Sequence, residues 1–509
     1  MNEKSRTENS IRNIFTGLFG QGLQVLLSFI NRMVFIRCLS ADYLGLNGLF
    51  TNVLSVLSLA ELGIGSAIVY ALYKPLAEKD EKKIAAYMNF YARAYKTIGI
   101  IVAVAGIIML PFLKVIINVP YQIHENIYVL YCISLFNTSI TYFFSYKSSL
   151  LIADQKNYVV LLCSYCTSFA QTIFQIIILL LTRNYILYLL VQTACGMIYN
   201  VWISRVADKS YPFLGNTKYK LTSGEKGRLV RDIRALVITK LSSVLVNNTD
   251  NILITFFKGL ATTGVTSNYT LLVNTLNNLL NQIFNGLTAS VGNLNAVETK
   301  EKKYFMFKVV NLANFWLFGW ATIGFVFLSS IIVELFFGSQ YVLEIDIVII
   351  MAVNFYTVGM QNAVWTYRGT LGLFRYGRYL LLVTAALNLF LSVVLGQRLG
   401  VFGILLATFI SRILTNIWYD PFAVFKHGLH LNPIIYLHMY IKYIGILLIT
   451  ICIIFGFNQI LKGTIWLVIL CITIPHAVFY IALRKTEECV YLKSMALQLV
   501  RRYLQCGAK

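Results

Sequence analysis

The sequence predicts an all-α integral membrane protein. Of its 509 residues, 58% are hydrophobic and only 13% are charged, whereas a soluble chain carries about 25% charged residues. The apolar residues form long runs, such as 98–117 and 158–181. Runs of about 20 residues match a hydrocarbon layer roughly 30 Å thick, because a helix rises about 1.5 Å per residue. Helices are favoured over a barrel because the runs lack the two-residue alternation of lipid-facing strands.

Fourteen apolar runs are long enough to cross a bilayer as helices. They lie near residues 14–37, 44–72, 92–117, 126–151, 158–182, 185–205, 234–257, 265–294, 304–333, 344–367, 377–396, 400–420, 437–458 and 463–483. The first run lacks a small-residue cleavage site of the A-x-A kind, so we expect a retained first span. An even number of spans places both chain ends on the same side of the membrane.

The chain is strongly basic, with 43 Lys and Arg against 21 Asp and Glu and a net charge of +22. Basic residues gather in alternate loops, for example throughout 205–234. The opposite loops hold only Arg32, Arg37, Lys114, Arg183, Lys258, Arg398 and Lys462. This asymmetry follows the positive-inside rule and predicts that both termini are cytoplasmic. No aromatic-basic binding module accompanies the charge, so nucleic acid is not expected as a partner.

The longest hydrophilic stretch, 206–232, divides the chain into six spans and then eight. An internal repeat relates the two parts, because Leu39 precedes Asn47 by the same interval as Leu260 precedes Asn268. We therefore predict the following divisions: an N-lobe of six helices at 1–206, a basic cytoplasmic linker at 207–233, a C-lobe of six helices at 234–420, two further helices at 421–483 and a basic cytoplasmic tail at 484–509.

Polar residues recur at helical spacing along the first, second, seventh and eighth spans. Stripes of this kind mark faces that are turned toward protein or water rather than lipid. Packing alone is an alternative, since Ser, Thr and Asn bond neighbouring membrane helices for about 0.6 kcal/mol each. The cost of placing charge in hydrocarbon favours a shared hydrated cavity. The candidate substrate-binding residues are Gln24, Asn31, Arg32, Arg37, Asn47, Glu61, Lys240, Asn247, Asp250, Asn274, Asn278, Asn281 and Asn285.

The side-chain chemistry of these stripes indicates a phosphorylated sugar as the ligand. Amides offer both donors and acceptors, which suits hydroxyl-rich molecules. Arg32, Arg37 and Lys240 add cations that can hold a phosphate or diphosphate. For Arg37 the simpler interpretation is that the side chain snorkels to the membrane surface.

Glu61 lies near the middle of its predicted span, and Asp250 lies about two turns from the outer end of its own. A carboxylate in a membrane is paired with a cation, protonated or part of an ion site. Pairing is favoured here, and an ion site at Glu61 and Asp250 stays open. Arg368 is most simply a positive-inside anchor, although Gln361 and Trp365 share its helix face and could extend the cavity.

No motif in the sequence indicates an enzyme. The P-loop and H-E-x-x-H patterns are absent, and no loop is large enough to hold a nucleotide. His427 and His430 have no further ligands nearby, so no metal is expected. Cys163 and Cys166 lie inside an apolar run and are expected to pack rather than to carry redox chemistry. We expect no cofactor.

Several motifs resemble the Wzx-type polysaccharide flippases, which translocate O-antigen and capsule repeat units. These motifs are RCLSADYLGLNGLF at 37–50, ELGIG at 61–65, YKPLA at 73–77, NNTDNILI at 247–254, NY at 268–269 and ASVGN at 289–293. The flippases belong to the multidrug/oligosaccharidyl-lipid/polysaccharide exporter superfamily. The resemblance implies two six-helix lobes in a V plus two C-terminal helices, a central cavity and alternating access.

The resemblance also implies the substrate, undecaprenyl-diphosphate-linked oligosaccharide moved from the inner to the outer leaflet of the bacterial cytoplasmic membrane. Membrane lipids, a polysaccharide polymerase and the chain-length machinery are the further partners expected. Two alternatives stay open. A cation-coupled multidrug exporter would share the fold but have a more apolar, aromatic chamber. A membrane-embedded polysaccharide polymerase should show a large loop with acidic or nucleotide-binding residues, and the sequence has no such loop.

Overall fold

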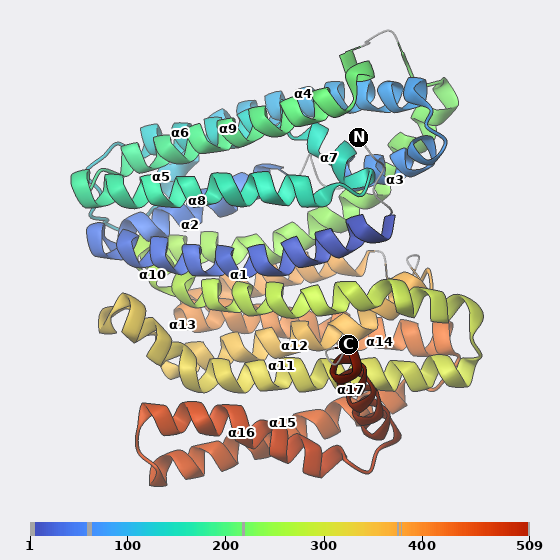
Figure 1. The fold of residues 1–509 in the computed structure, drawn as a ribbon. Helices are drawn as coiled ribbons and strands as arrows, with labels where there is room; N and C mark the ends of the chain where they lie inside the picture. Colours follow the sequence, from blue (N-terminus) through green and yellow to red (C-terminus); the bar gives the residue numbers. More distant parts are fainter. Residues whose placement is uncertain (1–5, 59–63, 216–218, 374–375, 378, 507–509) are drawn as a thin grey trace. The chain divides into compact units, whose positions relative to one another are not determined.

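The computed structural model describes residues 6–58, 64–215, 219–373, 376–377 and 379–506 (Figure 1). Every secondary-structure element in these ranges is a helix, as the sequence predicts. The chain forms two compact units, Met1–Ser267 and Asn268–Lys509, called here the N-terminal and C-terminal units. The lobe, linker and tail boundaries inferred from the sequence stay a prediction.

The N-terminal unit is a bundle of long helices joined by short turns. Its elements are α1 (Arg6–Cys38), α2 (Ala41–Leu57), α3 (Ile64–Ala77), α4 (Glu81–Met109), η2 (Leu110–Phe112), α5 (Leu113–Ile116), α6 (Ile127–Thr141), α7 (Tyr146–Ala153), α8 (Asn157–Thr182), α9 (Tyr185–Ser210), η3 (Pro212–Gly215) and the first part of α10 (Ser223–Val297). Helix α1 packs along α8, and α9 packs against both α6 and α8. Helix α6 also packs against α2 and so lies between α2 and α9 in this set of contacts.

One membrane segment of this unit is broken in its middle. Helices α6 and α7 meet at an angle of 44° across residues 142–145, and together they are long and apolar enough for one bent span. The break contains neither proline nor glycine. In membrane proteins, non-helical backbone is tolerated where it is buried in protein or lines a polar cavity.

Helix α10 contains the turn that the sequence places between the seventh and eighth spans. Gly259 interrupts the helix with φ +84° and ψ 174°, a conformation that favours glycine. The segment after this turn crosses α2 at very short range. A Cβ atom at Gly45 would lie 1.9 Å from the backbone oxygen of Leu260, and one at Gly264 would lie 2.2 Å from that of Ala41. Small residues thus let the two segments of the proposed internal repeat touch backbone to backbone.

The C-terminal unit is built around a core rich in aromatic residues. Its further helices are α11 (Lys300–Phe337), η4 (Ser339–Tyr341), α12 (Ile345–Thr370), α13 (Leu380–Leu414), α14 (Asn416–Ala423), the π-helix η5 (Val424–Leu429), α15 (Ile434–Ile460), α16 (Thr464–Leu483) and α17 (Glu487–Cys506). Helix α11 packs on α12 and α16, and α15 packs on α16. The ring of Phe315 stacks on that of Tyr443 with centroids 4.4 Å apart.

The predicted spans 377–396 and 400–420 coincide largely with α13. This helix bends at Gly400, which has φ +61°. A left-handed backbone of this kind is accessible to glycine at little cost, so the chain reverses there without a separate loop. Helix α14 and the π-helix then continue the segment as far as Leu429.

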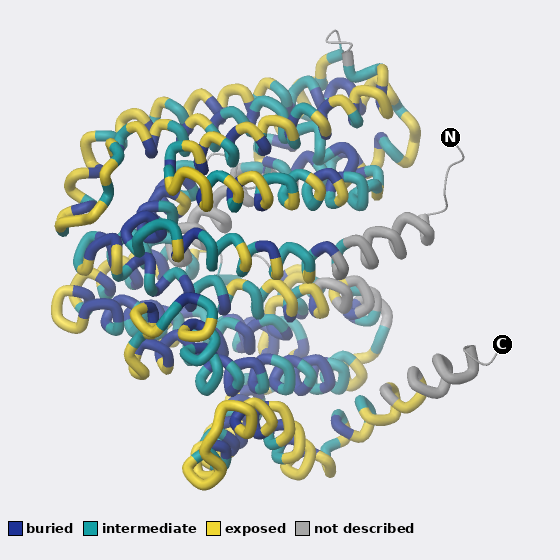
Figure 2. Tube along the Cα trace, turned by 60° about the vertical axis from the view of Figure 1, so that its left-hand side comes forward, coloured by how far each residue is buried: buried dark blue, intermediate teal, exposed yellow. Residues whose placement is uncertain are grey.

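The outer faces of the helices are strongly apolar, which identifies a multi-pass membrane protein. Figure 2 shows buried and exposed residues alternating along the helices, so that each turns one face inward. Large apolar side chains such as Leu181, Ile460 and Ile465 are almost fully exposed, at 77–79%. Patches of this kind are normal against lipid. Within the described ranges, eight helices, or nine with the bent α6–α7 pair, are long and apolar enough to span a membrane; the count of fourteen stays a prediction.

The last helix, α17, follows the final apolar span in the chain and packs against α11. Lys308 forms an ion pair with Glu487 at 3.0 Å, and Phe305 packs edge-on against Tyr491 at 5.3 Å. The sequence expected only a basic tail from residue 484 onward. The structure shows an amphipathic helix there because apolar residues recur at helical spacing between the charges.

Candidate functional site

The N-terminal unit encloses a polar cavity of about 500 Å³. Residues of α2, α6, α9 and α10 line it. Its volume falls in the range of about 300–1,000 Å³ that is typical of small-molecule sites. The cavity is therefore our candidate functional site.

Helix α2 supplies one polar wall. Asn47, Thr51, Ser55 and Ser58 all line the cavity, and they form the polar stripe that the sequence places on the second span. The three hydroxyls donate to backbone carbonyls one turn earlier, at 2.7–2.8 Å. Their hydrogens are thus used within the helix, while their oxygen lone pairs remain available to a ligand.

Helices α6 and α9 supply a second polar wall, which is not among the features predicted from the sequence. Ser134, Asn137 and Thr138 come from α6, and Gln192 and Thr193 come from α9. Their hydroxyls also donate to carbonyls of their own helices, at 2.9–3.0 Å. The i, i+3, i+4 spacing of the three α6 residues is the signal that could have identified this wall.

The broken span borders the same cavity. Thr138 and Tyr142 line it, and the turn between α6 and α7 begins at Tyr142. Asn248 of α10 completes the lining and lies beside Asn247, which the sequence proposes. A broken membrane helix beside a polar cavity is a frequent feature of transporter binding sites.

Three amide side chains in the cavity are open to a ligand. Among the residues that the structure describes, the side chains of Asn47, Asn137 and Gln192 make no hydrogen bond. All three are half-buried. The described lining contains no Asp, Glu, Lys, Arg or His. The described part of the lining thus presents neutral donors and acceptors.

The polar residues proposed on α1 do not line this cavity. The Asn31 amide donates to Gln175 at 3.2 Å and to the Tyr188 hydroxyl at 3.0 Å, so it joins α1 to α8 and α9. Arg32 donates to the Ser267 hydroxyl. Gln24 is half-buried, and Arg37 is exposed at the end of α1.

The proposed residues after the second span lie in several different settings. Glu61 and the side chains of Lys240, Asn247 and Asn285 lie outside the described residues. Asp250 is half-buried and engaged in a contact. In the C-terminal unit, Asn274 and Asn278 are exposed, and Asn281 accepts a hydrogen bond from Asn362 at 2.8 Å. The structure thus brings Asn47 into the cavity of the N-terminal unit, and the proposed ion site at Glu61 and Asp250 stays a prediction.

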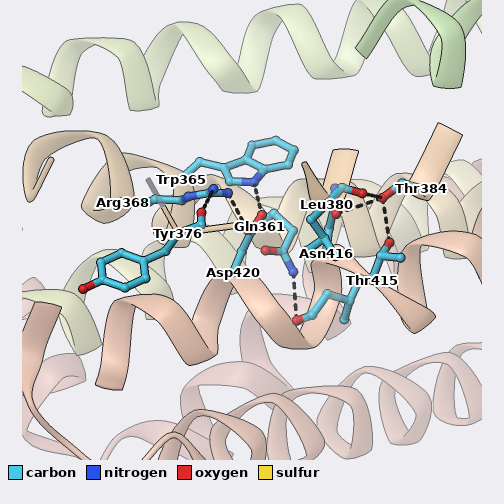
Figure 3. A network of polar contacts seen from close by, with 10 residues as sticks. Gln361, Trp365, Arg368, Tyr376, Leu380, Thr384, Thr415, Asn416 and Asp420 are labelled. Atoms are coloured by element: carbon cyan, nitrogen blue, oxygen red, sulfur yellow. Dashed lines mark hydrogen bonds and ion pairs between the residues drawn. The ribbon is translucent and has the colours of Figure 1, made fainter. Parts of the chain in front are cut away.

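The C-terminal unit contains a polar network of a different kind (Figure 3). Arg368 forms an ion pair with Asp420, whose side chain is only 3% exposed. Trp365 donates its indole N–H to the same carboxylate at 3.1 Å, and Arg368 also donates to the carbonyl of Tyr376. From the sequence, Arg368 is expected to be a surface anchor, and Trp365 could extend the cavity. In the structure both bind Asp420 within their own unit.

The C-terminal unit also holds an apolar cavity of about 810 Å³. Helices α11, α12, α13, α14 and α15 contribute to its lining. Aromatic residues are prominent, among them Tyr356, Phe409, Trp418, Phe422 and Tyr440. This cavity suits a hydrocarbon chain or an aromatic molecule.

Comparison with known proteins reveals likeness at the level of the fold. No protein-family model and no curated protein sequence matches the chain. A structure of the lipid II flippase MurJ in an inward closed conformation is 16% identical and matches with TM-score 0.63, covering 94% of this chain and 99% of that one. An inward-facing multidrug resistance MATE family transporter of the MOP superfamily is 13% identical, with TM-score 0.57, over 81% and 98% of the two chains.

A third similar structure is described by the polarity of its binding pocket. It is a MOP superfamily transporter from Pyrococcus furiosus, 14% identical with TM-score 0.52, covering 84% of this chain and 98% of that one. Its binding pocket is described as having reverse polarity, which suggests a different function. Together these structures show that the chain adopts the fold of transporters of the MOP superfamily.

Proposed function

We propose that this protein is a flippase that translocates undecaprenyl-diphosphate-linked oligosaccharide repeat units across the bacterial cytoplasmic membrane. The substrate would move from the inner to the outer leaflet, for capsule, O-antigen or exopolysaccharide synthesis. The observation that carries the proposal is the cavity inside a membrane-embedded bundle, whose described lining offers amides and hydroxyls and no charged side chain. Sugar hydroxyls cannot cross hydrocarbon unaided because unpaired polar groups are costly there.

Two further observations support a lipid-linked substrate. The fold is shared with a structure named as a lipid II flippase. The C-terminal unit has an apolar cavity of about 810 Å³, which provides a surface for a hydrocarbon chain.

The remaining parts of the mechanism are extensions of this proposal. The two lobes would alternate between inward-open and outward-open states while both termini stay in the cytoplasm. Arg32, Arg37 and Lys240 are the cations proposed for the diphosphate. Release of the repeat unit on the outer side would deliver it to a polysaccharide polymerase and the chain-length machinery.

A cation-coupled multidrug exporter is the second candidate. The fold is also that of a MATE family transporter, and the aromatic lining of the large cavity in the C-terminal unit favours an apolar drug. The polar cavity counts against this candidate, because none of its described lining residues is a carboxylate that could hold a cationic drug.

Reconstitution distinguishes these functions. The purified protein is placed in vesicles whose undecaprenyl-diphosphate oligosaccharide is confined to one leaflet. Transfer is followed by exposure of the sugar to an impermeant lectin on the opposite side. A flippase accelerates exposure without changing the glycan. Protein-dependent export of a dye cation, with no lectin exposure, would favour the exporter. Longer glycans without transfer would favour a polymerase.

A further inference from the structure

The three open amides of the polar cavity come from three different helices. Asn47 belongs to α2, Asn137 to α6 and Gln192 to α9. Each amide group has two N–H donors and a carbonyl acceptor. A ligand that satisfies all of them needs several groups that both donate and accept, distributed around its perimeter. A sugar ring has this arrangement of hydroxyls.

The electrostatics of the cavity favour an uncharged ring. No cation stands among the described lining residues to neutralise a carboxylate or phosphate. Helix α6 ends at Thr141, next to the cavity residues Thr138 and Tyr142. The C-terminal end of a helix carries partial negative charge and therefore disfavours an anion nearby. Moving an unpaired anion out of water into this site is unfavourable.

The apolar part of the lining complements a sugar ring as well. Phe50 and Leu54 of α2 and Leu189 of α9 also line the cavity, and all three are buried. Apolar lining suits the C–H faces of a sugar ring, while the amides meet its edges. The volume of about 500 Å³ leaves room for bridging waters, which serve polar contacts nearly as well as direct hydrogen bonds.

We propose that this cavity binds one neutral sugar residue of the transported glycan, and that Asn47, Asn137 and Gln192 select it against acidic sugars such as uronates. The inference rests on the proposed flippase function and deepens it. The diphosphate, which needs cations, binds elsewhere. A glycan with a neutral residue at the recognised position is transported, and one with a uronate there is rejected.

Binding is tested on the full-length purified protein by saturation-transfer NMR. The neutral probes are the methyl glycosides of glucose, galactose, mannose, N-acetylglucosamine and N-acetylgalactosamine. The acidic probes are methyl glucuronide and methyl galacturonide. At least one neutral glycoside should receive saturation, and both uronides should receive at least tenfold less. Absence of signal from every neutral probe, or equal signal from the uronides, would overturn the proposal.

Variants locate the site. Asn137→Leu should lower the neutral-sugar signal at least tenfold. Gln171→Leu is the matched control, because Gln171 bonds Gln175 on α8 at 3.4 Å and does not line the cavity; it should retain the signal. Gln192→Lys adds a cation and should make a uronide bind, a gain that misfolding cannot produce. Unchanged behaviour of both cavity variants would contradict the assignment.

The vesicle assay separates this inference from the proposed function. If the protein binds neutral glycosides but never exposes lipid-linked glycan to the lectin, the sugar site is supported and the flippase function is contradicted. If it exposes neutral and uronate-containing glycans at equal rates, and Gln192→Lys leaves the ratio of the two rates unchanged, the flippase function is supported and the selective sugar site is contradicted.

Discussion

Each unit of the protein contains a cluster of polar residues, and the two clusters differ in how their side chains are paired. In the C-terminal unit the Arg368 guanidinium and the Trp365 indole both bind Asp420 (Figure 3). In the N-terminal unit the amides of Asn47 and Asn137 face a cavity and, among the described residues, bond to no side chain or backbone group. Polar groups in a membrane bundle are costly unless they are paired. Polar side chains that are paired therefore indicate a structural role, and polar side chains that face a cavity without a partner indicate a binding site.

The largest effect expected from this contrast is at the buried ion pair. Asp420→Ala would leave Arg368 without its counter-charge. The Arg368 side chain is only 17% exposed, so water would compensate little for the loss. Removing one partner of a buried pair costs about 3–5 kcal/mol, so the variant should unfold at a much lower temperature. The double variant Arg368→Met, Asp420→Leu should recover most of the loss. Equal stability of wild type and Asp420→Ala in a thermal-shift assay would show that the pair is not structural.

A smaller loss is expected where α2 crosses the segment after Gly259. Gly45→Ala places a Cβ 1.9 Å from the carbonyl oxygen of Leu260, which is backbone and cannot move aside easily. Overpacking of this kind costs about 1–3 kcal/mol. Gly48→Ala, one turn away on α2, meets only a methyl group of Thr263 at 4.0 Å. That control should be neutral or slightly stabilised in chemical unfolding, because alanine favours a helix over glycine; a similar loss in both variants would show that the close approach to Leu260 is not the cause.

Helix α11 allows the paired and unpaired cases to be compared within one unit. Asn311 and Asn314 are both fully buried. The Asn314 amide donates to the carbonyl of Gly359 at 3.0 Å, whereas among the described residues neither amide atom of Asn311 has a partner. Asn314→Leu should therefore destabilise by about 1 kcal/mol, and Asn311→Leu should be neutral or stabilising. If Asn311→Leu were the more damaging in the same unfolding assay, a partner of Asn311 would have been overlooked.

The sequence predicts the helices well because their signals are local. Runs of apolar residues identify the spans, and the spacing of Asn47, Thr51 and Ser55 places them on one helix face, which lines the cavity in the structure. The break between α6 and α7 could not be predicted, since residues 142–145 contain no proline or glycine. The chain folds that segment through contacts that only the bundle supplies.

The sequence also does not predict whether a polar side chain meets a protein partner or a cavity. Asn31 lies on a stripe resembling that of α2, but its partners Gln175 and Tyr188 are 144 and 157 residues away in the chain. Helical spacing identifies the face on which a residue lies, and the fold decides whether that face meets a partner or a cavity. Gln192 was missed for the converse reason, because its own helix shows no clear polar stripe.

The smallest effect on stability is expected at the site itself, and it gives the sharpest test of the contrast. Asn47→Leu removes an amide that has no described partner, so the free energy of unfolding should change by less than about 0.5 kcal/mol. Asn52→Leu is the matched control on α2, because Asn52 is buried and its amide donates to the Gly48 carbonyl at 2.7 Å. In the lectin assay Asn47→Leu should translocate at least tenfold more slowly per folded molecule, whereas Asn52→Leu should lose stability and keep its rate. The opposite pattern would mean that the amide facing the cavity supports the fold, and open amides would no longer indicate a binding site in this protein.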